Sequence, residues 1–216
     1  MNLQYLLYRS SDPTVSNATL IALVGPSGAG KTTLARALQA LGFGRIPTTT
    51  TRSPRADEVV GRDLFSVPAQ RFNQMRTSNE VIATVEYSSA SYGVQLKHLR
   101  SAAQTALPQI IIVEPSGLQA LRAFADHAQM RFLTVFVTLS AEAVSTRLQS
   151  RYSKEDGRDD ELADRLGRAI SEVNQWRTVY PWDLVLESGD VKLDAESVYD
   201  LITRPTEPTE SFAACA

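Results

Sequence analysis

The stretch "GPSGAGKTT", residues 25–33, decides the fold that this sequence predicts. It follows the apolar run "TLIALV" (19–24), which is typical of a buried parallel strand. It precedes "LARALQALG", where leucines recur at helical spacing and Gly42 is a helix stop signal. A strand, a glycine-rich turn and a helix follow in order, and the turn completes the P-loop pattern G-x-x-x-x-G-K-[ST].

Each residue type in this turn suits a phosphate. Glycines let backbone N–H groups converge on phosphate oxygens without Cβ clashes, and the next helix offers its unpaired N–H groups and positive dipole end. Lys31 can reach the β- and γ-phosphates, and Thr32 can coordinate Mg²⁺. The sequence therefore predicts a nucleoside triphosphate site formed by Gly25, Ser27, Gly28, Ala29, Gly30, Lys31, Thr32 and Thr33.

Composition sets the wider limits. A chain of 216 residues with 43% hydrophobic and 21% charged residues is typical of one compact globular domain. Its net charge of -2 gives no overall positive potential that would attract nucleic acid or an anionic membrane. No apolar run is close to the length needed to span a membrane. A single cysteine, Cys215, and no secretory signal in residues 1–17 favour a cytoplasmic protein.

Further along the chain, apolar runs alternate with helical patterns. Residues 110–113, 131–139 and 183–188 are predicted as buried strands, and 140–152, with Ser140 as its N-cap, as one of the intervening helices. This alternation predicts an α/β fold of the P-loop NTPase type, with a mostly parallel sheet and helices on both faces. Residues 1–17 are expected to form an extension, and 204–216 a disordered tail.

A second anion site is suggested by "TTTTRSPRADEVVGRD", residues 48–63. Arg52 and Arg55 lie three apart among hydroxyl residues, and guanidinium groups suit phosphate because their planar fork donates in pairs. Tyr92 adds a further donor. Taken alone, this segment favours a solvated loop that carries ordinary surface arginines over a phosphate site.

These segments, together with "NEVIATVEYSSASYG" and "RLQSRY…ADRL", resemble guanylate kinases in order and spacing over residues 19–200. The resemblance implies a guanylate-kinase-like domain over 18–203, with an acceptor-binding lobe at about 48–95 and a lid at about 152–164. It also implies ATP as phosphoryl donor, Mg²⁺, and phosphoryl transfer to a nucleoside monophosphate, GMP or dGMP.

The resemblance also assigns roles to single residues. Arg52, Arg55 and Tyr92 would grip the acceptor phosphate, and Thr48 would touch the guanine. Lys31, Arg151 and Arg165 would stabilise the transferring group, with Arg147 beside ATP, since Arg147 and Arg151 share a helix face. Glu114 follows a buried strand and could face the acceptor or the Mg²⁺ shell.

The base-reading positions depart from the family pattern. Ala83, Val94 and Ile112 replace a carboxylate, a hydroxyl and a carboxylate, and Leu64 replaces a phosphate-binding Tyr; Glu86 could reach the base instead. The acceptor could therefore be a modified nucleotide or ribose 1,5-bisphosphate. A non-catalytic binding module is a third possibility, although such modules typically lose the P-loop lysine, which is present here as Lys31.

Overall fold

The computed structural model describes residues 18–87, 89–152, 166–167, 169, 171–172, 175–178, 180–187 and 190–203, without the side chains of residues 141, 151 and 152. The predicted N-terminal extension, nearly all of the predicted lid and the predicted tail lie outside these residues. No helix within the described ranges is long and apolar enough to cross a membrane.

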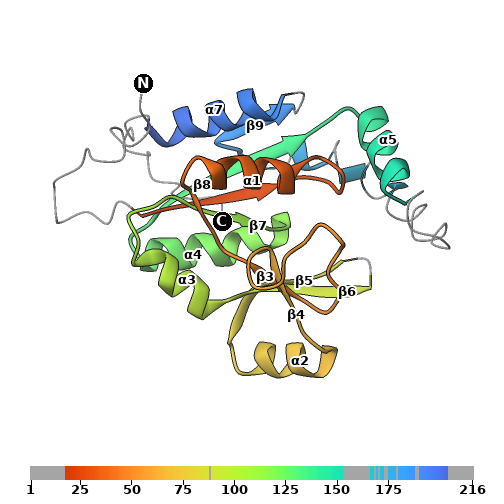
Figure 1. The fold of residues 1–216 in the computed structure, drawn as a ribbon. Coiled ribbons are helices and arrows are strands. Elements are labelled where there is room, and N and C mark those ends of the chain that lie inside the picture. The colour runs from red at the N-terminus through yellow and green to blue at the C-terminus, as the bar shows by residue number, and fades with distance from the viewer. Residues whose placement is uncertain are drawn as a thin grey trace, which may run out of the picture.

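The larger of two sheets is parallel and has the strand order β2-β7-β1-β8-β9 (Figure 1). Its strands are β1 (Thr19–Val24), β2 (Gly44–Arg45), β7 (Gln109–Ile112), β8 (Arg131–Thr138) and β9 (Leu184–Glu187). All six residues of β1 are buried, and this strand pairs with β7 on one side and β8 on the other. The apolar run before the P-loop is thus the centre of the sheet, as a strand covered on both faces requires.

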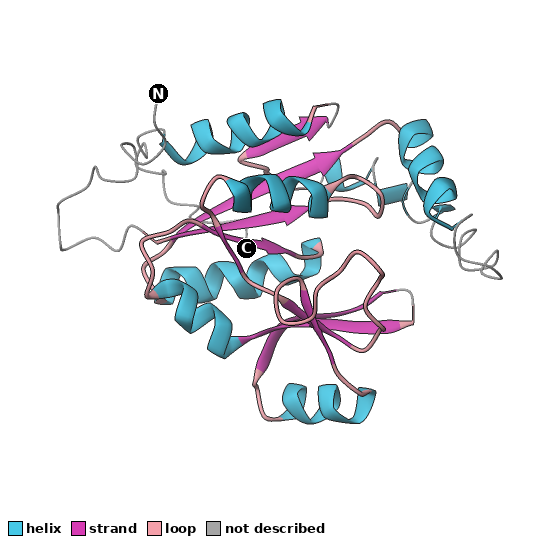
Figure 2. Ribbon diagram, in the orientation of Figure 1, coloured by secondary structure: helices cyan, strands magenta, loops and turns pink. Residues whose placement is uncertain are grey.

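Helices cover both faces of this sheet (Figures 1 and 2). Helix α1 (Lys31–Ala40) and α7 (Val191–Thr203) pack on the face that carries Ile21 and Leu23 of β1. Helix α3 (Leu96–Ala103) and α4 (Leu118–His127) pack on the opposite face, with Leu20 and Ala22. The predicted α/β class with helices on both faces is confirmed.

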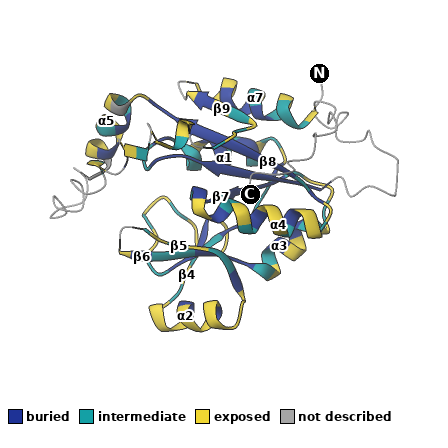
Figure 3. Ribbon diagram, turned by 180° about the vertical axis from the view of Figure 1, so that it is seen from behind, coloured by how far each residue is buried: buried dark blue, intermediate teal, exposed yellow. Residues whose placement is uncertain are grey.

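A smaller sheet of order β4-β3-β6-β5 lies within the residues of the predicted acceptor lobe (Figure 2). Its strands are β3 (Thr48–Thr50), β4 (Leu64–Ser66), β5 (Val81–Tyr87) and β6 (Ala90–Gln95). Helix α2 (Ala69–Thr77) covers one face, where Phe72 lies 3.3 Å from the position of a Cβ on Gly93; most of α2 is exposed (Figure 3). Val94 points the other way, into the core shared with α3 and α4.

Local signals place the element ends well. Helix α1 ends at Ala40, and Gly42 follows with a φ of +92°. Helix α5 (Ala141–Tyr152) begins as expected, since the backbone N–H of Ala143 donates to the Ser140 hydroxyl at 3.2 Å. The turn η2 (Pro115–Gly117) and the two-residue strand β2 are not predicted, because they are too short to show a periodic pattern.

Replacement of Leu38 tests the packing of α1 on the sheet. Leu38 is fully buried among the α1–α7 contacts, so Leu38→Ala should lower the free energy of unfolding by about 2–5 kcal/mol. Leu193 of α7 is 60% exposed, and Leu193→Ala should change it by less than about 0.5 kcal/mol. Urea unfolding followed by circular dichroism measures both, and equal losses would contradict this packing.

Candidate active site

The P-loop leaves β1 at a point where only glycine fits. A Cβ on Gly25 would lie 2.0 Å from the carbonyl oxygen of Val137 in β8, well inside van der Waals contact. Gly30 then starts α1 with a φ of +99°, a left-handed conformation that favours glycine, and no side chain caps the helix. The first N–H groups of α1 therefore face a turn that is suited to an anion.

Lys31 lies over this turn. Its ammonium donates to the carbonyl oxygens of Gly25 and Pro26, the latter at 2.8 Å. Thr32 is half-buried and Thr33 is exposed, both in the first turn of α1. The lysine thus sits where the dipole end of the helix and the loop meet, which suits contact with the terminal phosphates of a nucleotide.

Helix α5 borders the P-loop. A Cβ on Gly28 would lie 3.2 Å from Cγ of Leu148, a fully buried residue of α5. Arg147 is exposed on this helix. Arg151 also belongs to α5, but its side chain lies outside the described residues, as does all of Arg165. Helix α5 therefore lies beside the P-loop, and contacts of Arg147, Arg151 and Arg165 with ATP remain predictions.

Glu114 lies at the carboxyl edge of the parallel sheet, beside the P-loop strand. It directly follows β7, and the N–H of the preceding Val113 donates to the Leu23 carbonyl of β1 at 3.2 Å. Burial raises the pKa of the Glu114 carboxyl, and the nearby charge of Lys31 partly opposes that rise. Whether Glu114 faces the acceptor or the Mg²⁺ shell, as the sequence suggests, remains a prediction.

Three of the predicted acceptor residues, Arg52, Arg55 and Tyr92, come together beside the smaller sheet. Arg52 donates from Nε to the Tyr92 hydroxyl at 3.1 Å. Both terminal nitrogens of Arg52 donate to the carboxylate of Glu58, at 2.7 and 2.6 Å, and Arg55 donates to the same carboxylate at 3.2 Å. Two guanidinium groups and a phenol therefore converge, as a phosphate site would need.

In the sequence, Glu58 begins the run E-x-x-G-x-D that ends at Asp63, which resembles guanylate kinases more than ribose-bisphosphate kinases, but the sequence assigns it no role. Burial alone would raise the pKa of its carboxyl, but the hydrogen bonds from Arg52 and Arg55 outweigh burial and hold that pKa below its usual range. The signal that could have found it is an acidic residue three positions after Arg55, close enough to reach back within one turn.

Comparison with known proteins identifies the family. Residues 17–204, most of the chain, match the family described as guanylate kinase. The chain belongs to the guanylate kinase family. The guanylate kinase of Rubrobacter xylanophilus is 32% identical over 160 residues, which cover 71% of this chain and 78% of the relative. That of Trichormus variabilis is 30% identical over 167 residues, or 73% of this chain and 77% of the relative.

The fold agrees with a solved member of the family. The crystal structure of guanylate kinase from Anaplasma phagocytophilum superposes with a TM-score of 0.65 at 21% identity, covering 87% of this chain and 86% of that one. Because guanylate kinases are nucleoside-monophosphate kinases, this chain is a nucleoside-monophosphate kinase by family.

The positions that the resemblance assigns to base recognition are mostly apolar in this guanylate kinase family member. Thr48 is half-buried and pairs with Leu64, which is 2% exposed, and Val94 is 1% exposed. Ala83 lies at the irregularity of β5 with a φ of +52°, and its Cβ is 3.0 Å from the position of a Cβ on Gly117. These positions offer a base little hydrogen bonding beyond the Thr48 hydroxyl.

Glu86 does not compensate for Ala83. Its carboxylate accepts hydrogen bonds from the Ser91 hydroxyl at 2.8 Å and lies 3.8 Å from Arg76 of α2. It therefore lies on the side of the smaller sheet that α2 covers. The expectation that Glu86 could reach the base is wrong for this arrangement, because the strand alternation turns its side chain away.

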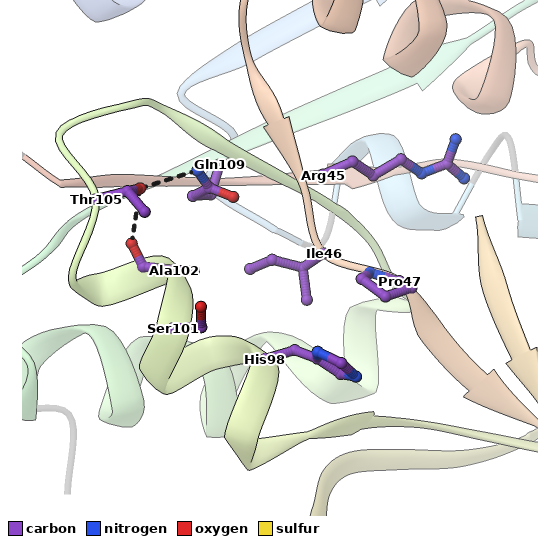
Figure 4. A pocket seen from close by; sticks show the side chains of 8 residues that line it. All are labelled: Arg45, Ile46, Pro47, His98, Ser101, Ala102, Thr105 and Gln109. Carbon is purple, nitrogen blue, oxygen red and sulfur yellow. Dashed lines mark hydrogen bonds between the residues drawn. The ribbon is translucent and has the colours of Figure 1, made fainter. Parts of the chain in front are cut away.

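A separate cavity of about 140 Å³ lies between β2 and α3 (Figure 4). Arg45, His98 and Gln109 are among its lining residues, and His98 stacks on Phe65 of β4 with ring centroids 5.1 Å apart. It shares no lining residue with the P-loop or with Arg52 and Arg55. In the part of the chain that the structure describes, no three His, Cys, Asp or Glu side chains gather as a metal site.

The raised pKa of Glu114 predicts how the stability of a Glu114 variant changes with pH. Because its pKa is raised in the folded protein, its contribution to stability is present at acid pH and is lost as the pH rises through the folded pKa. Relative to the parent, Glu114→Gln should therefore gain stability as the pH rises from 4 toward 8.

Urea unfolding across that pH range measures the difference. Glu80→Gln is the matched control, since the pKa of Glu80 is lowered by hydrogen bonding to Ser78, and its stability difference should change with pH in the opposite direction. An advantage of Glu114→Gln that shrinks as the pH rises would contradict a raised pKa for Glu114.

Proposed function

We propose that this enzyme transfers the γ-phosphoryl group of ATP to the phosphate of GMP or dGMP, giving ADP and the nucleoside diphosphate. The observation that carries the proposal is the presence of two separate groups of residues suited to binding anions. An intact P-loop with Lys31 lies on the parallel sheet, and Arg52, Arg55 and Tyr92 converge on the smaller sheet. A kinase needs one site for the donor and one for the acceptor, whereas a nucleotide hydrolase needs only the first.

The chemistry relies on position and charge. Loop N–H groups and Lys31 would hold the donor phosphates, and Mg²⁺ would bind Thr32 together with phosphate oxygens. Thr32 fits this role because it is half-buried in the first turn of α1, whose N-terminus no side chain caps. Arg151 and Arg165 would neutralise charge on the transferring group, and no covalent intermediate with the protein is required.

The apolar residues at the predicted base-reading positions support a second candidate acceptor. Ala83 and Val94 cannot hydrogen-bond the donors at N1 and N2 of guanine, so discrimination between bases should be weak. A modified nucleotide, or ribose 1,5-bisphosphate, would use the same phosphate site. A non-catalytic binding module is disfavoured because Lys31 is present in an intact loop. A cytoplasmic location is part of the proposal, since a single cysteine needs no oxidising compartment.

A panel of acceptors tests this function. ADP release with ATP and Mg²⁺ would be measured for GMP, dGMP, the other nucleoside monophosphates and ribose 1,5-bisphosphate. We expect the highest kcat/KM with GMP or dGMP, and a loss of about 100-fold or more in kcat for Lys31→Ala, because that ammonium stabilises charge on the phosphates.

Two outcomes would contradict the proposal. Turnover of ribose 1,5-bisphosphate without turnover of GMP or dGMP would move the assignment to the second acceptor. Tight ATP binding with no turnover of any acceptor would favour the binding module.

A further inference from the structure

The carboxylate of Glu58 is the centre of the arginine cluster. It accepts four hydrogen bonds, namely two from the Arg52 guanidinium at 2.7 and 2.6 Å, one from the Arg55 guanidinium at 3.2 Å and one from the Arg55 backbone N–H at 2.8 Å. Its side chain is only 8% exposed. A paired arginine–carboxylate contact of this kind fixes the plane of the guanidinium as well as its position.

Arg52 is held on several sides at once. Nε donates to Tyr92, and Nη1 donates to the Ser53 carbonyl at 2.9 Å in addition to Glu58. Nη2 also donates to Glu58. A guanidinium has five N–H donors, so these four hydrogen bonds leave one N–H, on Nη2, for a further acceptor. A phosphate arriving at Arg52 would meet a guanidinium whose orientation is already fixed.

Glu58 is itself part of the loop backbone structure. Its N–H donates to the Arg55 carbonyl at 3.1 Å, and its carboxylate accepts from the Arg55 N–H, which closes a turn over residues 55–58. Departure of the carboxylate would therefore remove one of the two hydrogen bonds of this turn as well as release the arginines. The hydrogen bond to the Arg55 N–H supports a structural role for the carboxylate in this loop. A carboxylate that only fills the phosphate site in the absence of phosphate would not need this bond.

The same loop is anchored to the parallel-sheet domain. Asp63, with a side chain 1% exposed, accepts from the N–H of Val59, the residue after Glu58, at 2.8 Å and pairs with Arg45 of β2. The guanidinium of Arg45 points out of the cavity that its stem lines (Figure 4). Arg36 of α1 donates to Asp57 at 3.2 Å on the other side of Glu58. The turn with Glu58 thus lies between two anchors to the domain that carries the P-loop.

We propose that Glu58 is a positioning residue for the acceptor phosphate. It holds Arg52 and Arg55 at fixed orientations, and the Asp63–Arg45 pair holds the turn that carries it against the parallel sheet. The inference rests on the proposed function, because an acceptor phosphate is the ligand that the two arginines would meet.

The test is the difference between the effects of Glu58→Gln on the KM for GMP and on the KM for ATP. The amide keeps the volume but loses the charge and one acceptor oxygen, so the arginines lose their fixed orientation. We expect the KM for GMP to rise about 10- to 100-fold, which corresponds to loss of a charge-assisted hydrogen bond, while the KM for ATP stays within about 3-fold of the parent. Asp63→Asn should raise the KM for GMP in the same direction.

Glu80→Gln is the matched control. Glu80 belongs to the same lobe and accepts from Arg71 at 2.7 Å, but its side chain is 45% exposed, and it should leave both KM values unchanged. Folding is checked by urea unfolding, because removal of one partner of a buried ion pair destabilises a protein. Should Glu58→Gln not fold, Glu58→Asp, which retracts the charge by one methylene, is measured in its place.

Three results would overturn the proposal. A fall in the KM for GMP would mean that the carboxylate competes with the phosphate, and a change in that KM no larger than the change in Glu80→Gln would mean that Glu58 has no special role. An equal rise in the KM for ATP would mean a general structural role. If the parent enzyme does not turn over GMP at all, the proposed function fails instead. The same difference is then measured with the acceptor that the panel identifies.

Discussion

The close approach of Gly25 to the Val137 carbonyl is the constraint on which the nucleotide site depends. Strand β1 pairs with β8 up to Val24 and Phe136, so the next residue of the chain meets the backbone of β8 directly. With a Cβ position 2.0 Å from that oxygen, only glycine lets the chain turn there. The loop can then return through Gly30 into α1, with Lys31 over the turn and α5 alongside.

The acceptor side depends on a different principle, which is the neutralisation of clustered cations by buried carboxylates. Arg52 and Arg55 share Glu58, and Arg45 and Arg62 share Asp63, whose pKa is held below its usual range by hydrogen bonds from Arg62 and Val59 that outweigh burial. Two arginines with one carboxylate keep a single net positive charge, so a chain with a net charge of -2 can still present locally positive sites. The pairing also keeps the arginines in place before any phosphate arrives.

The parallel sheet and the P-loop were predictable because their signals are local. Residues 19–24 form an uninterrupted apolar run, and the glycines, Lys31 and Thr32 follow at fixed spacing. Arg52, Arg55 and Tyr92 could be proposed from type and spacing, although Tyr92 lies 40 residues from Arg52 and meets it only through the pairing of β3 with β6.

Other features depend on tertiary contacts that no local pattern carries. The two residues of β2 form a strand only because β7 lies beside them. The left-handed backbone of Ala83 follows from the irregularity of β5, and Glu86 is turned toward α2 by strand register. The role of Glu58 needed its distances to two arginines, since an acidic residue in a charged loop is usually solvated.

A crystal structure with a dinucleotide that joins adenosine and guanosine through five phosphates tests the central claim most directly, because such a ligand spans the donor and acceptor sites. The account predicts that the phosphates on the adenosine side contact Lys31 and the N–H groups of the P-loop. It predicts that the phosphate next to guanosine contacts Arg52, Arg55 and Tyr92, with Glu58 still bound to both arginines. A guanosine-side phosphate bound away from these three residues, with the adenosine side on the P-loop, would contradict the account.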